Sequence, residues 1–201
     1  MLGKIFVSFS VSSRILTHYL FFQCKFDRIV CYLTNWSHKR PGQGQFNPED
    51  LDPFLCTHVI YAFANLNSEF KLIPSEPSDE SSDGKPGLYD RVLALKSKNP
   101  NLKISLAVGG WMMGPTPFKT LTESAYRQTL FTFNVIEFLR KKGFDGLDVC
   151  WEFPRGAEDK ERYSKLLKVS STPDSMTVAI EFISYSLYCT TFIPLGIARN
   201  F

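Results

Sequence analysis

Residues 144–154 read Phe-Asp-Gly-Leu-Asp-Val-Cys-Trp-Glu-Phe-Pro, and from Leu147 onward they alternate between apolar and polar side chains. A period of two is that of a β-strand, in which successive side chains point to opposite faces of the sheet. One face holds Leu147, Val149, Trp151 and Phe153, and the other holds Asp148, Cys150 and Glu152. Because apolar side chains fill every position between the polar ones, the pattern predicts a buried strand rather than an edge strand with solvated acids.

The polar row of this strand can carry acid–base chemistry. Neighbours on one face of a strand lie about 6.5 to 7 Å apart at Cα, close enough for their side chains to hydrogen-bond and to shift each other's pKa. Such a row can keep one carboxylic acid protonated beside an ionised partner.

The same residues resemble the DGxDxDxE signature of glycoside hydrolase family 18, the chitinases and chitinase-like lectins, except at one position. The resemblance implies that Glu152 is the general acid that protonates the glycosidic oxygen. It makes Asp148 the inner acid of the series and Asp145 the first, structural acid. Cys150 stands where the family has a further acid.

That altered position bears on the reaction, which in this family is a retaining, substrate-assisted hydrolysis of β-1,4 links between N-acetylglucosamine units. The acetamido group of the sugar attacks the anomeric carbon, and the enzyme supplies no carboxylate nucleophile. The missing acid would steady the positive oxazolinium ion, whereas a thiol is mostly neutral at pH 7 and hydrogen-bonds weakly. Losing such a partner removes roughly 3 to 4 kcal/mol of stabilisation, so we expect hydrolysis to be slowed about 100- to 1,000-fold.

A second motif lies upstream, where residues 102–111 read as an apolar strand that ends in Gly109, Gly110 and Trp111. Glycines at a strand end allow a ligand or another backbone to approach closely, although a plain turn is the simpler reading of two glycines alone. The segment resembles the SxGG motif of the same family, with Ala107 where serine is frequent. Trp111 matches an aromatic residue on the substrate floor.

Two further strands are predicted nearer the N-terminus, over residues 28–36 and 56–64. They resemble the first and second barrel strands of the family. Tyr32, Trp36 and Phe63 match positions whose flat rings stack on sugars in relatives. Core packing is the ordinary role of any single aromatic residue, and only the three matching positions together favour a sugar-binding role.

Helix signals separate these strands. Residues 47–50 combine an N-cap asparagine, a proline and early acids, which open a short helix. Further helices are predicted over 88–98 and 124–142. Strands alternating with helices indicate an α/β fold with a parallel sheet, and the resemblance implies a (β/α)8 barrel with its active site at the carboxyl ends of the strands.

The resemblance covers residues 28–168, the first four barrel strands with their helices, whereas such a barrel takes about 250 residues. We therefore expect a partial barrel from a truncated, alternatively spliced or mispredicted product. Residues 1–27 read as an extension or a poor signal segment, because Arg14 and His18 interrupt the apolar run. Residues 169–201 are an unmatched tail, too polar for a confident membrane anchor.

Composition excludes several classes of function. Hydrophobic residues make up 44% of the chain and the formal net charge is +3, which favour a globular protein without a nucleic-acid partner. The three histidines lack metal-ligand spacing, and we expect no metal. No cofactor is expected either. Residues 79–85, rich in serine and aspartate, read as a flexible surface loop.

The resemblance also pairs two of the five cysteines. Cys31 and Cys56 match a disulfide of animal members, the alternative being a pair of buried thiols. A disulfide would imply an oxidising compartment, and hence a secreted or extracellular protein.

Three functions remain open: a chitinase-type glycosidase, a lectin-like protein that binds chitin or N-acetylglucosamine oligomers without cleaving them, and a non-functional fragment with unpaired strand edges. Turnover of substrate separates the first from the second, and solubility of the expressed chain separates the third from both. The sequence predicts no oligomeric state.

Overall fold

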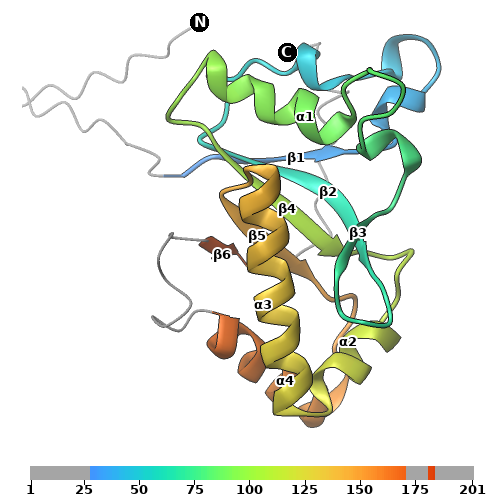
Figure 1. Cartoon of the computed structure of the whole chain (residues 1–201), viewed down its shortest axis with the longest axis vertical. Coiled ribbons are helices and arrows are strands. Elements are labelled where there is room, and N and C mark those ends of the chain that lie inside the picture. Colours follow the sequence, from blue (N-terminus) through green and yellow to red (C-terminus); the bar gives the residue numbers. More distant parts are fainter. Residues whose placement is uncertain (1–27, 171–180, 184–201) are drawn as a thin grey trace, which may run out of the picture.

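The computed structural model describes residues 28–170 and 181–183. A mainly parallel sheet has the strand order β1-β2-β4-β5-β6, and β3 pairs antiparallel with β2 (Figure 1). The strands are β1 (Val30–Thr34), β2 (His58–Leu66), β3 (Leu72–Pro74), β4 (Lys103–Gly109), β5 (Gly146–Cys150) and β6 (Glu181–Ile183). The predicted α/β class with a parallel sheet is confirmed.

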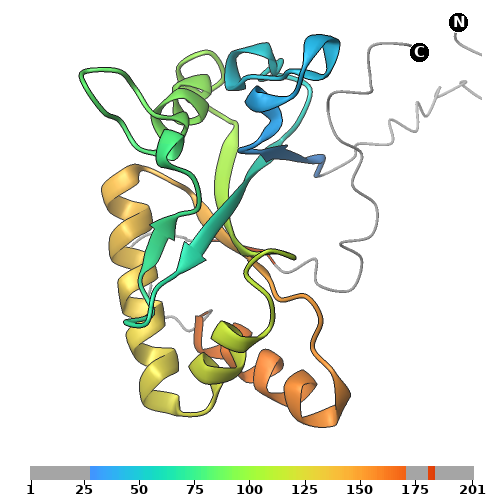
Figure 2. The same cartoon turned by 90° about the vertical axis from the view of Figure 1, so that its right-hand side faces the viewer.

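The helices follow the strands in alternation. The α-helices are α1 (Leu88–Leu93), α2 (Thr116–Thr122), α3 (Ala125–Lys142) and α4 (Gly156–Ser170). Short 3₁₀ helices are η1 (Ser37–Lys39), η2 (Gly42–Gly44), η3 (Pro48–Asp50), η4 (Pro77–Asp79) and η5 (Ala94–Ser97). Figures 1 and 2 show α3 running along one face of the sheet, with α2 and α4 beyond one end of it.

The predicted helix ends are explained by local chemistry. Ser124 caps α3 by accepting a hydrogen bond from the Arg127 backbone amide, and the helix ends at Gly143, whose φ of 94° is left-handed. The helix predicted over residues 88–98 is present, but only its first part is α-helical. The α-helix α1 ends at Leu93, and the 3₁₀ helix η5 continues it. The sequence did not predict β3 or α2, and no bounds were predicted for α4, the helix that the resemblance implies after the fourth strand.

Each central strand sends alternate side chains to two different cores. The larger core lies between sheet and helices and contains Val59, Tyr61, Leu106, Val149 and Trp151 together with helix residues such as Phe131 and Val135. The smaller core is built from strand residues alone: Ile60, Ala62, Phe63, Ala107 and Cys150, with Val30 and Tyr32 against it. The alternation predicted for the strand near Asp148 is thus observed. The strand β5 ends at Cys150, the alternation continues through the buried Trp151, and it is broken at Phe153, which is 47% exposed.

The predicted disulfide between Cys31 and Cys56 is confirmed, with a Cα–Cα distance of 6.1 Å. It ties β1 to the segment just before β2. On the chain-entropy model, closing a loop of this size contributes roughly 3 kcal/mol to stability.

The structure adds detail to two predicted segments. Residues 79–85 are not uniformly a surface loop, because Asp79 is 1% exposed while residues 81–86 are exposed. The segment 169–201, predicted as an unmatched tail, includes β6, which pairs in parallel with β5 from Gly146↔Glu181 to Asp148↔Ile183.

The predicted signal-like segment at residues 1–27 lies outside the described residues, as do most of the tail and its apolar run. None of the helices described is both long enough and apolar enough to cross a bilayer.

Candidate active site

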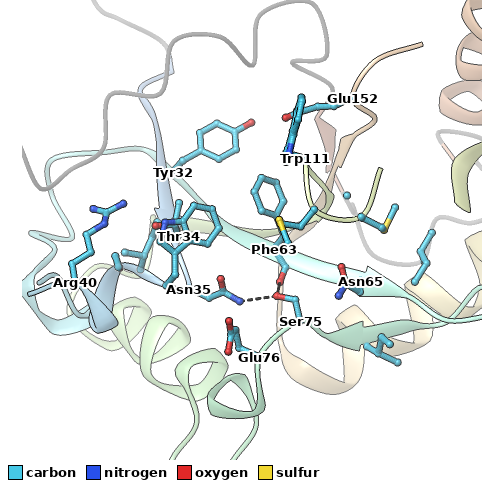
Figure 3. A pocket seen from close by; sticks show the side chains of 18 of the residues that line it. Tyr32, Thr34, Asn35, Arg40, Phe63, Asn65, Ser75, Glu76, Trp111 and Glu152 are labelled. Carbon is cyan, nitrogen blue, oxygen red and sulfur yellow. Dashed lines mark hydrogen bonds between the residues drawn. The ribbon is translucent and has the colours of Figure 1, made fainter. Parts of the chain in front are cut away.

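A cavity of about 840 Å³ opens at the carboxyl ends of β1, β2, β4 and β5 (Figure 3). Residues from all four strand ends or the loops that follow them line it, including Tyr32, Phe63, Trp111 and Glu152. Parallel strands of an α/β fold deliver functional side chains at this edge.

Glu152 reaches the cavity because the residue before it is firmly anchored. Trp151 is 1% exposed, and its ring stacks on Phe118 of α2 at 5.4 Å and meets Tyr163 of α4 edge-on at 5.8 Å. The Tyr163 hydroxyl donates to the Val149 carbonyl at 3.0 Å. Two helices therefore hold the end of β5 from the outer face, and Glu152 projects on the opposite side.

The polar row of β5 is assembled on the inner face, as the sequence predicts. Asp148 is 2% exposed, and its Oδ2 accepts a hydrogen bond from the Tyr32 hydroxyl at 3.1 Å. Cys150 is also buried, and its thiol donates to Glu152 Oε1 at 3.6 Å. The two hydrogen-bonded pairs, Tyr32–Asp148 and Cys150–Glu152, together form a cluster of polar side chains at β1, β5 and the residues just after β5.

Asp145 lies at the other end of β5, away from this cluster. Its Oδ2 accepts from the Ile104 backbone amide at 2.7 Å and lies 2.7 Å from Lys96 Nζ. The carboxylate joins the amino ends of β4 and β5, in keeping with the structural part that the resemblance gives it.

Glycine is required at position 109 by the close approach of another backbone segment, and at position 110 by a left-handed φ of 78° and the Phe63 ring beside it. A Cβ at Gly109 (φ 114°) would lie 2.2 Å from the Cys150 carbonyl oxygen, and the Gly110 amide donates to that same oxygen at 2.9 Å. These glycines let the strand ends under Cys150 and Glu152 pack tightly.

The predicted aromatic residues divide into two groups. Trp36, which is 41% exposed, stacks on Phe63 with centroids 6.2 Å apart and planes inclined by 23°. Trp111 is 76% exposed and lines the cavity beside Glu152 (Figure 3). Exposed flat rings beside a carboxylic acid can stack on the apolar faces of sugar rings.

Several lining residues were missed from the sequence: Asn35, Arg40, Asn65, Ser75, Glu76 and Met113. Asn65 lies near the end of β2, Ser75 and Glu76 lie between β3 and η4, and the others lie in the segments after β1 and β4, where no motif marks them. Asn35 lay inside the first predicted strand, residues 28–36, and its place directly after β1 became clear only in the structure. Within the residues described, no three histidine, cysteine or acidic side chains come together as a metal site.

The family model for glycosyl hydrolases family 18 matches residues 28–173. The chain belongs to this family. Mouse chitotriosidase-1 is 45% identical to it over 145 residues, which are 70% of this chain and 30% of the relative. This family 18 chain therefore spans about a third of that relative's length.

Solved family 18 structures share the fold. An immunomodulatory active chitinase from Trichuris suis, TsES1, matches with a TM-score of 0.70 and 34% identity, covering 78% of this chain and 43% of its own. Human YKL-39, described as a pseudo-chitinase with retained chitooligosaccharide binding, matches with a TM-score of 0.68, 34% identity and the same coverage. The prediction of a partial (β/α)8 barrel is confirmed, since the chain covers less than half of these proteins.

Proposed function

We propose that this family 18 protein binds chitin or chito-oligosaccharides in the cavity beside Glu152 and hydrolyses them slowly. The observation that carries the proposal is the cluster of Tyr32, Asp148, Cys150 and Glu152, which retains the candidate acid and holds a thiol beneath it. Both an active chitinase and a pseudo-chitinase with retained chitooligosaccharide binding match the chain.

In this proposal Glu152 donates the proton to the leaving glycosidic oxygen. It is placed for that step by the anchored Trp151 and by its position on the cavity wall. Asp148, held by the Tyr32 hydroxyl, supplies the remaining inner negative charge. Trp36, Phe63 and Trp111 provide the faces for sugar rings, and Gly109 and Gly110 keep the strand ends close.

The thiol of Cys150 is the weak point of such a reaction. It presents a hydrogen-bond donor to Glu152, whereas a carboxylate at this place would add negative charge next to the developing oxazolinium ion. The expected loss is roughly 3 to 4 kcal/mol, or about 100- to 1,000-fold in rate.

The test is Cys150→Asp in the full chain, assayed for turnover of a soluble N-acetylglucosamine tetramer, with Cys150→Ser as the neutral control. We expect Cys150→Asp to raise turnover about 100- to 1,000-fold and Cys150→Ser to leave it unchanged, both variants being checked for folding by circular dichroism. Unaltered turnover in a well-folded Cys150→Asp protein would sink the proposal for this residue.

A lectin-like protein without any hydrolysis is the second candidate, and the YKL-39 match favours it. It predicts retention on chitin beads with no release of soluble oligomers. We further propose that residues 28–168 form the sugar-binding unit and that the protein is secreted, which agrees with the Cys31–Cys56 disulfide.

A further inference from the structure

Beneath the cavity lies a buried carboxylate that the proposed reaction does not use. Asp79 ends η4 and is 1% exposed, and among the described residues no lysine, arginine or histidine nitrogen comes within 4.0 Å of its oxygens. Burying a carboxylate without a cation is costly unless several hydrogen bonds satisfy it.

Three donors surround Asp79. The Tyr61 hydroxyl donates to Oδ1 at 2.6 Å, the Glu76 backbone amide donates to Oδ2 at 3.0 Å, and Asn35 Nδ2 lies 3.2 Å from Oδ2 and 3.4 Å from Oδ1. Burial raises the pKa of Asp79, while the three donors act in the opposite direction.

The contacts of Asn35 continue to the cavity wall. Its Nδ2 also donates to Ser75 Oγ at 2.7 Å, and the Ser75 hydroxyl donates to the Phe63 carbonyl at 2.6 Å (Figure 3). Asn35, Phe63, Ser75 and Glu76 all line the cavity, and Asp79 does not. The carboxylate is therefore connected through the buried Asn35 side chain to residues that form the cavity wall.

The hydrogen-bonding chemistry of these groups fixes the orientation of the Asn35 side-chain amide. A carboxylate only accepts, so Asp79 dictates that the amino end of the Asn35 amide faces it and that the carbonyl end turns elsewhere. Both Asn35 amino hydrogens are then used, one by Asp79 and one by Ser75. Without the acid, the amide of Asn35 is free to flip and the serine loses its fixed donor.

We infer that Asp79 is a positioning residue for the sugar-binding cavity, holding Asn35 and Ser75 in one orientation behind the Trp36–Phe63 stack. This rests on the proposed function. It extends that proposal to a residue that never touches the ligand.

The test compares Asp79→Asn with Tyr61→Phe in the full chain. Asp79→Asn keeps the shape but replaces an acceptor oxygen by a donor, whereas Tyr61→Phe removes a donor to the same carboxylate from the core side and leaves the Asn35 contact in place. Binding of an N-acetylglucosamine tetramer is measured by calorimetry, and folding by thermal melting.

We expect Asp79→Asn to weaken binding roughly 10-fold, the equivalent of one misplaced hydrogen bond, and Tyr61→Phe to lower the melting temperature with binding within about twofold. In an Asn35→Ala background, Asp79→Asn should cause no further loss of affinity, because its effect passes through Asn35. In ligand-free protein, the side-chain amide protons of Asn35 should exchange faster in Asp79→Asn than in Tyr61→Phe.

Unchanged affinity and unchanged Asn35 exchange in a folded Asp79→Asn protein would overturn the inference while leaving the proposed function intact. A wild-type protein that binds no tetramer would instead overturn the proposed function, and with it the role of Asp79 in binding. Should Asp79→Asn not fold, Asn35→Ala and Ser75→Ala are combined, and strictly additive losses of affinity would refute the shared network.

Discussion

The two faces of the parallel sheet differ in what they contain and in what covers them. The outer face packs Leu106, Val149 and Trp151 against the helices in one large apolar core. On the inner face, a small core made only of strand residues lies beside Asp148, Tyr32 and the cavity that Glu152 lines. Adjacent residues of one strand thus serve stability and candidate chemistry separately.

This separation follows from the pleat of a β-strand. Along β5 and the residue after it, the side chains of Val149 and Trp151 point outward, and those of Asp148 and Cys150 point inward. Substitutions on the outer face should therefore change stability with little effect on ligand affinity in the folded protein, and those on the inner face should do the reverse.

The largest effect is expected for Trp151→Ala. Removing this buried ring leaves a cavity between Phe118 and Tyr163, and we expect a loss of about 3 to 5 kcal/mol of unfolding free energy, measured by denaturant titration. A loss below 1 kcal/mol would contradict the view that the outer core anchors Glu152.

Next comes Asp145→Asn at the amino end of β5. The change removes the ion pair with Lys96 and weakens the bond from the Ile104 amide, so we expect a loss of about 1 to 3 kcal/mol of stability. Lys103→Ala is the matched control, since its 3.9 Å contact with Asp145 is largely exposed and should contribute below about 0.5 kcal/mol. Tetramer affinity should stay unchanged in both, and a selective loss of affinity would place Asp145 in the binding site instead.

Trp36→Ala tests the inner face of the sheet, where the cavity lies. The ring is partly exposed and stacks on Phe63, so its loss should weaken tetramer binding roughly 5- to 10-fold. The melting temperature should change far less than in Trp151→Ala. Equal affinity to wild type in calorimetry would remove Trp36 from the proposed sugar surface.

The smallest effect concerns pH and Asp159 on the outer side. The Arg155 backbone amide, together with Lys119 of α2, lowers the pKa of Asp159. Its stabilising contribution is therefore present above the ordinary pKa of about 3.9 and is lost as the pH falls through the lower folded value. The difference in unfolding free energy between wild type and Asp159→Asn should shrink between pH 6 and about pH 3.

The contribution of Asp79 to stability should depend on pH with the opposite sign, because burial raises the pKa of this carboxyl. Its contribution is most favourable below the unfolded pKa and is lost as the pH rises through the folded value. The same denaturation series on Asp79→Asn checks this, and an identical pH trend for both aspartates would contradict the assignment of their surroundings.

Much of the fold was predictable because it depends on local patterns. The alternation through Val149 and Cys150 places side chains on two faces in any pleated strand, and the Ser124 and Gly143 signals bound α3 as expected. The short β3 and the helix α2 were missed, since three residues carry too little periodicity and the start of α2 is stabilised by packing of Phe118 rather than by a capping side chain.

The candidate site, like the fold, was predictable only in part. The sequence alone determined the family signature, the odd thiol at Cys150 and the residues that carry the proposed chemistry, because these are properties of residue type and spacing. Only the tertiary structure decided that Tyr32 reaches Asp148, that Gly109 makes room for the Cys150 carbonyl, and that Asp79 is buried behind the cavity. The physical reason is that hydrogen bonds and burial between residues far apart in the chain depend on how the strands are brought together, which no local pattern encodes.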